Sequence, residues 1–274
     1  MKCKSCGNIY QQNFCPVCGE KKFDPKQLSI KHFIEETFEG FVHFDNKFLC
    51  TLKTLVFQPG QLAVNYIQGR RVKFMKPVQF FLVINVLFFF LSLGNNLYSL
   101  SLNNYLNFKP FTNYHTRHIV EEKLKSSGLS IAEYSQLFNE RIVSDSKEFI
   151  FIFVLFYAFL LFLLFFWKKK YFVAHLVFAS HFVAFVLLLN LFEYYLLNIP
   201  FYIIEKKNYS QSFDSFYAIF TSVSIAIYLV FALKKFYKPP LIVTIFVAAA
   251  VGYTFFYFVQ YYRMLLFFKI LYFK

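Results

Sequence analysis

Charged residues are scarce in this chain of 274 residues, in which only 16% are Asp, Glu, Lys or Arg and only 15 are acidic. A soluble domain carries about 25% charged residues, so an ordinary soluble fold is excluded. The five cysteines are too few for a disulfide scaffold of this length. No P-loop, dinucleotide fingerprint or Gly-x-Ser-x-Gly elbow occurs, and residues 1–10 lack the apolar core of a secretory signal. The N-terminal segment is therefore expected to stay in the cytosol.

Apolar side chains are instead abundant, at 58% of the chain, and 43 residues are Phe. The mean hydropathy of +0.46 excludes a disordered chain. One soluble core could not bury so many Phe side chains, because much of a compact domain of this size faces water. The composition therefore predicts an integral membrane protein.

Five apolar runs approach the length of about 20 residues that crosses a bilayer as a helix. They cover residues 78–97, 149–167, 172–196, 213–233 and 241–262. The sequence thus predicts an all-α integral membrane protein with about five transmembrane helices in a bundle at 78–262. A loop at 98–148 would be extracytoplasmic, and residues 263–274 would form an interfacial tail.

Lys and Arg residues predict the orientation, because basic residues near span ends stay on the cytoplasmic side. Residues 1–77 and the short loops after the second and fourth spans together carry 18 basic and 6 acidic residues, whereas the loop at 98–148 carries 6 of each. We therefore expect a multi-pass protein of the inner (cytoplasmic) membrane, with its N-terminus in the cytoplasm and its C-terminus outside. The basic face would attract anionic lipids, and nucleic acid is not expected as a partner.

Two Cys-x-x-Cys-Gly motifs stand at the N-terminus, and their thiols are Cys3, Cys6, Cys15 and Cys18. Each pair points two thiolates at one centre, the following glycine permits a tight turn, and four sulfurs complete a tetrahedral Zn(II) shell. A closed four-sulfur shell leaves no open position for a substrate, so the zinc is predicted to be structural. It would fold a ribbon at residues 1–24 that is too small to be stable alone.

Residues 28–77 are predicted to form a juxtamembrane amphipathic module. One helix would follow a cap at Ser29, with apolar residues at three- and four-residue steps as far as Phe41. A second would follow a cap at Asp45 and carry an apolar face that includes Phe48 and Leu55. Two or three such helices before a span are expected to lie in the membrane interface.

A dense motif ends this module. It comprises Pro59, Gly60, Tyr66, Gly69, Arg70, Arg71 and Pro77. Pro59 and Gly60 should start a short helix that Gly69 stops. The Pro-Gly, Tyr-Ile-x-Gly-x-Arg and later Pro elements resemble an uncharacterised bacterial membrane family, domain of unknown function 3667. The resemblance implies a membrane location, often with an N-terminal zinc ribbon, and supplies no known reaction.

Arg70 and Arg71 would stand where the chain enters the membrane, directly after Gly69. Arg side chains pair phosphate oxygens bidentately, so a lipid headgroup or a lipid-linked phosphate is a candidate ligand. The simpler interpretation is preferred: the two arginines only set the membrane topology, and Gly69 only ends a helix.

Ionisable residues inside a span are costly and mark candidate functional positions. The third predicted span contains His175, His181 and Glu193. His175 and Glu193 share a helix face but lie about 27 Å apart along it, so they cannot touch within one helix. His181 lies deeper and is the better candidate for a proton or ligand contact, although a histidine bonded to a neighbouring helix is the simpler interpretation.

Four further ionisable residues in the predicted loop could line one helix face. They are His115, His118, Glu121 and Glu122. A solvated charged helix is preferred here to a metal site, because no His-Glu-x-x-His pattern occurs.

These features favour an interaction or scaffold subunit rather than an enzyme. Its zinc ribbon would dock a partner, and the partner would be another protein or a second copy of the chain. One alternative is a lipid- or lipid-phosphate-binding enzyme or carrier that uses Arg70, Arg71 and His181. A proton-coupled small-molecule transporter is a second alternative, although the spans show no evident inverted repeat.

Overall fold

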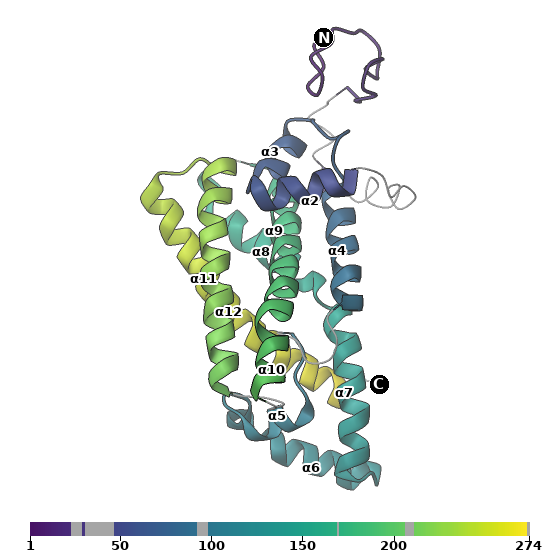
Figure 1. The fold of residues 1–274 in the computed structure, drawn as a ribbon, viewed down its shortest axis with the longest axis vertical. Helices are drawn as coiled ribbons and strands as arrows, with labels where there is room; N and C mark the ends of the chain where they lie inside the picture. Colours follow the sequence, from purple (N-terminus) through teal and green to yellow (C-terminus); the bar gives the residue numbers. More distant parts are fainter. Residues whose placement is uncertain (23–28, 31–46, 92–97, 169, 206–210, 273–274) are drawn as a thin grey trace. The chain divides into compact units, whose positions relative to one another are not determined.

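A computed structural model describes residues 1–22, 29–30, 47–91, 98–168, 170–205 and 211–272 (Figure 1). Over these ranges the secondary structure is helical, apart from two isolated antiparallel β-bridges near the N-terminus. The chain divides into two compact units. Unit 1 comprises Met1–Leu87, Ile152–Leu188 and Ile225–Ala249, and unit 2 comprises Phe88–Phe151, Leu189–Ser224 and Ala250–Lys274.

Unit 1 combines the N-terminal ribbon with the juxtamembrane module and parts of the long helices. Its elements are α2 (Lys47–Phe57), α3 (Gln61–Ile67), most of α4 (Pro77–Leu91), α8 (Phe151–Leu164), η3 (Phe166–Lys168), the first part of α9 (Phe172–Glu193), the end of α11 (Gln211–Phe236) and the start of α12 (Leu241–Tyr272). α2 buries Thr51 and Leu55, which are four residues apart and share one helix face. The backbone carbonyl of Leu55 accepts a hydrogen bond of 3.2 Å from the Tyr228 hydroxyl of α11.

Unit 2 contains the region that the sequence predicts as a loop at 98–148, and that region is largely helical. Its elements are α5 (Leu102–Asn107), the 3-10 helix η2 (Phe111–Tyr114), α6 (Thr116–Ser127), α7 (Ile131–Glu148), the π-helix η4 (Tyr194–Asn198) and α10 (Ile199–Glu205), with the remaining parts of α9, α11 and α12. A capping box between Ser130 and Glu133 begins α7. The Tyr105 ring packs against Phe138 at 5.8 Å and against Phe267 of α12 at 4.9 Å between centroids.

Three helices in the described residues are long and apolar enough to cross a membrane: Phe172–Phe201, Ser215–Phe236 and Leu241–Tyr272. A fourth results if α7 and α8, which are bent by 43° at their junction, are taken as one span. The structure therefore has three candidate membrane-spanning helices among the described residues, and the five predicted spans are not confirmed.

The predicted spans at 78–97 and 149–167 are not among these three helices, for a physical reason. α4 has 15 residues and α8 has 14, so at 1.5 Å per residue they measure about 22 Å, less than the hydrocarbon core of about 30 Å. The predicted span at 78–97 ends in residues 92–97, which lie outside the described residues. Apolar composition alone overestimated the length of α8.

α12 also differs from its prediction. It continues to Tyr272, so residues 263–272, which were predicted as an interfacial tail, are helical. This stretch contains no glycine or proline that would end a helix. The helix predicted to start at Ser29 lies largely outside the described residues, as does the Asp45 cap.

Candidate functional site

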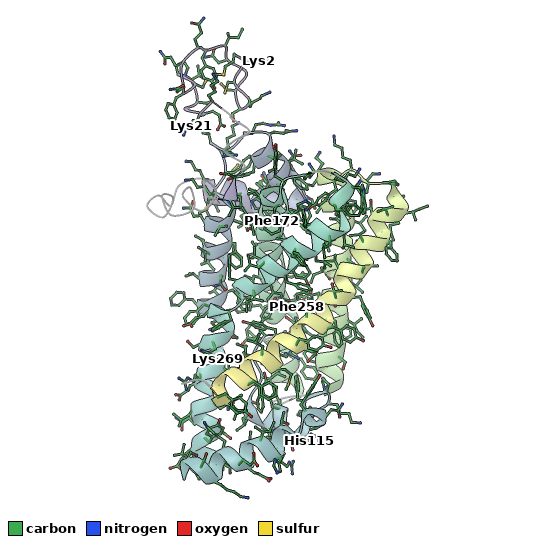
Figure 2. The ribbon with its side chains drawn as sticks, turned by 180° about the vertical axis from the view of Figure 1, so that it is seen from behind. Lys2, Lys21, His115, Phe172, Phe258 and Lys269 are labelled. Carbon is green, nitrogen blue, oxygen red and sulfur yellow. The ribbon has the colours of Figure 1, made fainter. Side chains whose placement is uncertain are left out.

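The ribbon at the N-terminus is built from two similar turns. The N–H of Gly7 donates to the carbonyl of Cys3 at 3.1 Å, and the N–H of Gly19 donates to that of Cys15 at 2.9 Å. Both glycines have a positive φ, 81° and 72°, which explains why a glycine follows each cysteine pair. Bridges pair Lys2 with Ile9 and Phe14 with Lys21, and Figure 2 labels the two lysines beside the sulfur atoms.

The four cysteine sulfurs lie together. The Sγ atoms of Cys3 and Cys18 are 3.5 Å apart, those of Cys6 and Cys15 are 3.6 Å apart, and all four lie within 4.8 Å of one another. Sulfurs bound at about 2.3 Å around a tetrahedral ion lie about 3.8 Å apart, so the residues fit a four-coordinate metal. The four cysteines that the sequence predicts as ligands thus lie close together, and the arrangement could hold a metal ion.

The thiols differ in their readiness to ionise. Burial raises the pKa of Cys15, but backbone N–H groups of Cys18 and Val17 donate to its sulfur and lower the pKa to about 6. A backbone N–H of Glu20 acts to lower the pKa of Cys18, yet burial and hydrogen bonds with the other thiols raise it to about 12. Thiolates this close together repel one another, and a cation bound among them would relieve that repulsion.

A buried carboxylate connects the ribbon to the Gly69–Arg71 segment. Glu20 is 5% exposed, and its Oε2 accepts a hydrogen bond from the Ser5 hydroxyl. The same oxygen accepts from the backbone N–H of Arg71 at 3.1 Å and of Val72 at 3.3 Å. Glu20 was not predicted as a functional residue, although it is an acid that directly follows the second cysteine motif in a basic segment.

Gly60 has two reasons to be a glycine. Its φ is 79°, and a Cβ atom would lie 2.5 Å from the carbonyl oxygen of Ala232 in α11. α3 therefore starts in close contact with the α11 backbone. Gly69 also has a φ of 79° and follows the end of α3, as the motif predicts, and Pro77 is the first residue of α4. Pro59 immediately precedes Gly60.

The two arginines of the motif have different surroundings. The Arg71 guanidinium lies 4.0 Å from the centre of the Tyr66 ring, and its Nε donates to the Tyr66 carbonyl at 3.2 Å. The Arg70 guanidinium hydrogen-bonds instead to the side chain of Gln68. Arg71 thus stabilises the turn after α3, and Arg70 faces a pocket.

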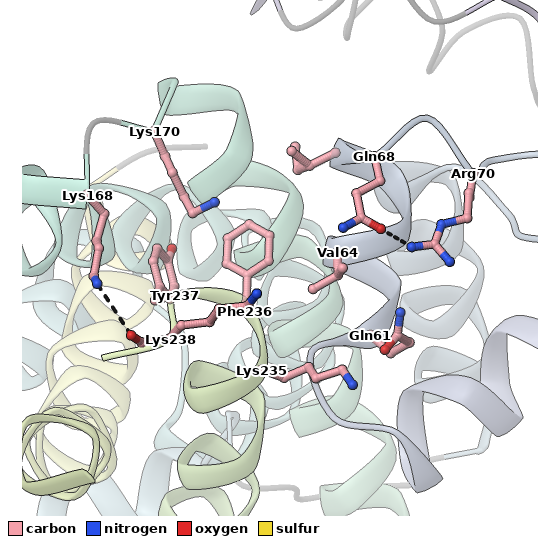
Figure 3. Close-up of a pocket in the computed structure, with 11 residues that line it drawn as sticks. Gln61, Val64, Gln68, Arg70, Lys168, Lys170, Lys235, Phe236, Tyr237 and Lys238 are labelled. Atoms are coloured by element: carbon pink, nitrogen blue, oxygen red, sulfur yellow. Dashed lines mark hydrogen bonds between the residues drawn. The ribbon is translucent and has the colours of Figure 1, made fainter. Parts of the chain in front are cut away.

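This pocket has a volume of about 720 Å³ (Figure 3). Five cations line it: Arg70, Lys168, Lys170, Lys235 and Lys238. They come from the segment after α3, from the segment between α8 and α9, and from the end of α11 and the residues that follow it. No Asp or Glu is among the residues that line it in the described part of the chain. We call this the basic pocket.

The lysines of the basic pocket are held close together. Lys168 Nζ donates to the carbonyl of Lys238 at 3.4 Å, and Lys170 Nζ lies 4.7 Å from the centre of the Phe236 ring (Figure 3). Burial lowers the pKa of Lys170, and the charges of Lys238 and Lys168 lower it further. An anion among these groups would reverse that repulsion.

His175 supports one wall of the pocket. It is 1% exposed, and its Nδ1 is 2.8 Å from the hydroxyl of Tyr237, which lines the pocket. The Tyr237 ring stacks on Phe165 at 4.1 Å between centroids. His175 is therefore bonded to the residue that directly follows α11.

The other polar residues predicted inside the third span occupy separate surroundings. His181 is 6% exposed, its Nδ1 has no hydrogen-bond partner among the described residues, and it lines two voids of about 10 and 20 Å³. Glu193 belongs to unit 2, where its Oε2 accepts from the Thr221 hydroxyl at 2.5 Å. His175 and Glu193 thus fall in different compact units.

Among the described residues, the four cysteines are the one group of three or more His, Cys, Asp or Glu side chains that could hold a metal ion. The histidines of the predicted loop belong to no such group there. His115 precedes α6 with a φ of 54°. His118 Nδ1 lies 3.8 Å from a carboxylate oxygen of Glu122, and both side chains are exposed. This arrangement matches the solvated helix that the sequence favours.

One family model matches the chain, and its description is a protein of unknown function (DUF3667). The match covers residues 45–89, which include α2, α3, the motif from Pro59 to Pro77 and most of α4. The chain is similar to this family over that segment, which confirms the resemblance seen in its motif. The searches among curated proteins and among solved structures gave no match.

Proposed function

We propose that this protein binds a phosphate group at the membrane surface, in the basic pocket that Arg70 forms with Lys168, Lys170, Lys235 and Lys238. The observation that carries the proposal is the convergence of five cations, without a lining carboxylate, on a pocket of about 720 Å³. Arg and Lys side chains bind phosphate oxygens through charge-assisted hydrogen bonds. The sequence by itself favours a scaffold over this function, and the pocket is our reason for preferring phosphate binding.

The position of the pocket along the chain supports a ligand at the membrane boundary. Lys170 directly precedes Tyr171 and the start of α9 at Phe172, Lys235 lies in the last turn of α11, and Lys238 is close to the start of α12 at Leu241. All three helices belong to candidate spans. In the orientation that the Lys and Arg counts favour, this boundary is the cytoplasmic face of the inner membrane.

The size of the pocket favours a phosphate with a larger polar group attached to it. Pockets for small molecules typically measure about 300–1,000 Å³, and this one falls within that range. The ligand would be the phosphorylated headgroup of an anionic lipid or a soluble phosphate compound, since both present the same oxygens to Arg70 and the lysines. Gln61 and Gln68, which also line the pocket, offer amide groups to hydroxyls of the ligand.

The test uses the full chain purified in mild detergent and mixed with phosphatidylglycerol, phosphatidylcholine or inorganic pyrophosphate. Native mass spectrometry should detect phosphatidylglycerol bound in preference to phosphatidylcholine, and the double variant Lys170→Ala/Lys235→Ala should lower that binding about tenfold, or about 1.4 kcal/mol. Competition by pyrophosphate would identify a site that accepts free phosphate compounds as well as a lipid.

The matched control is Lys73→Ala, which removes an exposed charge close to Arg70 in sequence but outside the pocket. It should leave binding nearly unchanged. Equal lipid and pyrophosphate binding by the wild type and the Lys170→Ala/Lys235→Ala variant would refute the proposal.

We also propose that the metal of the four cysteines is Zn(II) in a structural role. A closed set of four thiolates at these sulfur distances suits zinc. Purified protein should contain one zinc per chain by elemental analysis, and Cys15→Ser should lose it. A different metal at full occupancy, or no metal, would contradict the assignment.

Docking of a partner by the ribbon has weaker support. The Glu20 side chain of the ribbon hydrogen-bonds to the chain's own backbone at Arg71 and Val72. A transporter function also has little support, because His181 lines only voids that are about the size of a water molecule.

A further inference from the structure

The carboxylate of Glu20 is the polar link between the metal ribbon and the residues beside the basic pocket. One of its oxygens accepts hydrogen bonds from the Ser5 hydroxyl, from the Arg71 N–H at 3.1 Å and from the Val72 N–H at 3.3 Å. Ser5 lies between the first two cysteines, and Glu20 follows the last cysteine motif directly. The link therefore involves both turns of the ribbon.

The conformation of the ribbon determines where this carboxylate lies. The Glu20 carbonyl accepts from the Cys15 N–H at 2.9 Å, so the residue belongs to the second cysteine turn. The buried apolar cluster of the ribbon consists of Cys3, Tyr10 and Cys15, with Cys18 packed against it. Such a small cluster cannot hold a fold by itself, so the ribbon needs its metal ion to position Glu20.

The two residues that Glu20 contacts directly follow Arg70 in the chain. The Arg70 N–H donates to the Asn65 carbonyl at 2.9 Å on one side, and the next two N–H groups donate to Glu20 on the other. Two consecutive N–H groups that converge on one carboxylate form a small anion-binding nest. Arg70 thus enters the pocket from a backbone that is held on both sides.

We infer that the metal-loaded ribbon regulates the anion affinity of the basic pocket through Glu20. Loss of the metal would release Glu20, free the backbone at Arg71 and Val72, and leave Arg70 without a fixed orientation toward the bound phosphate. This inference rests on the proposed function of the pocket. It assigns the ribbon a role within its own chain, in which the metal state of the cytosol sets the affinity for the phosphate ligand.

Binding of phosphatidylglycerol to the full chain in detergent provides the first test. Glu20→Ala should keep the zinc content and lower the affinity about three- to tenfold, and Glu20→Gln should have a smaller effect, because an amide oxygen still accepts from N–H groups. Removal of zinc from the wild type with a chelator should lower the affinity by a similar factor. The two changes combined should not add, since both act through one link.

Hydrogen exchange of the Arg71 and Val72 amides provides a second readout that does not depend on the ligand. Exchange should accelerate in Glu20→Ala and in the zinc-free wild type. The control is Glu133→Gln, which alters a carboxylate that also accepts hydrogen bonds from a backbone N–H and a serine hydroxyl, but in unit 2. It should change neither the exchange at 71 and 72 nor the lipid affinity.

The outcomes separate the two proposals. If lipid binding depends on Lys170 and Lys235 but is unchanged by Glu20→Ala and by removal of zinc, the regulation is overturned and the proposed function stands. Faster exchange on zinc removal in a protein whose pocket binds no phosphate would overturn the proposed function and with it the regulation of affinity. Unchanged exchange and unchanged affinity in zinc-containing Glu20→Ala would show that Glu20 carries no coupling.

Discussion

The two compact units differ in whether their charged side chains have partners of opposite charge or cluster with like charges. In unit 2, Lys269 of α12 pairs with Asp145 of α7 at 2.7 Å, and Lys147 Nζ donates to the Phe89 carbonyl at 3.0 Å. In unit 1, the lysines around the basic pocket gather near Arg70 with no carboxylate among the lining residues described. A paired charge is compensated within the fold, whereas clustered like charges repel one another and suit a ligand of the opposite sign. This contrast makes unit 1 the candidate binding region.

The largest effect on stability should come from a substitution that pushes α3 away from α11, since residues beside both helices line the basic pocket. Gly60→Ala would place a Cβ 2.5 Å from the Ala232 oxygen and force a side chain into a backbone with a φ of 79°. We expect a loss of about 3 kcal/mol in stability, from a strained backbone plus overpacking. Thermal unfolding in detergent measures it. Gly128→Ala, at a φ of 71° but with open space around the new Cβ, is the control and should cost clearly less.

Breaking the ion pair of unit 2 should have the next largest effect. Asp145→Ala leaves Lys269 without its carboxylate, and because the Lys269 side chain is 27% exposed we expect a loss near 2 kcal/mol rather than the larger cost of a fully buried pair. Asp145→Ala/Lys269→Ala should recover part of it. In unit 1, Lys170→Ala should change the melting temperature little. Equal destabilisation by Asp145→Ala and Lys170→Ala would remove the contrast between the units.

The two adjacent arginines should separate stability from binding within unit 1. Arg71→Ala loses the Tyr66 stacking and a hydrogen bond, for about 1–2 kcal/mol of stability. Arg70→Ala should leave the melting temperature nearly unchanged and lower phosphatidylglycerol binding several-fold. Comparison of melting curves with native mass spectra checks both expectations. The reverse assignment of effects would mean that Arg71, not Arg70, contacts the ligand.

The smallest effect should be a dependence of binding on pH. Burial and the neighbouring Lys238 and Lys168 lower the pKa of Lys170. Lys170 therefore loses its charge at a lower pH than an ordinary lysine, and phosphate affinity should decline as the pH rises into the alkaline range. Lys238→Ala removes one cause of the lowered pKa, so the decline should begin at a higher pH. Identical pH profiles would contradict a role for this charge cluster.

Features that depend on near neighbours in the chain were predictable. The cysteine spacing and the following glycines predicted a four-sulfur site, because each Cys-x-x-Cys-Gly turn is a local structure. The Pro-Gly and Gly69 positions predicted a short helix, and α3 runs from Gln61 to Ile67 between them. Apolar composition predicted a membrane protein, but it overestimated the length of α8.

Amino-acid order alone was enough to predict the cluster of four cysteines, the long apolar helices and the motif around Gly60, since each depends on spacing or composition. Only the tertiary structure decided that Arg70 shares a pocket with lysines from two distant segments, and that Glu20 bonds to the backbone of Arg71, 51 residues away. These contacts depend on how helices pack and on which long side chains then meet. No local pattern in the chain encodes that, because side-chain direction is set by the partners that surround it.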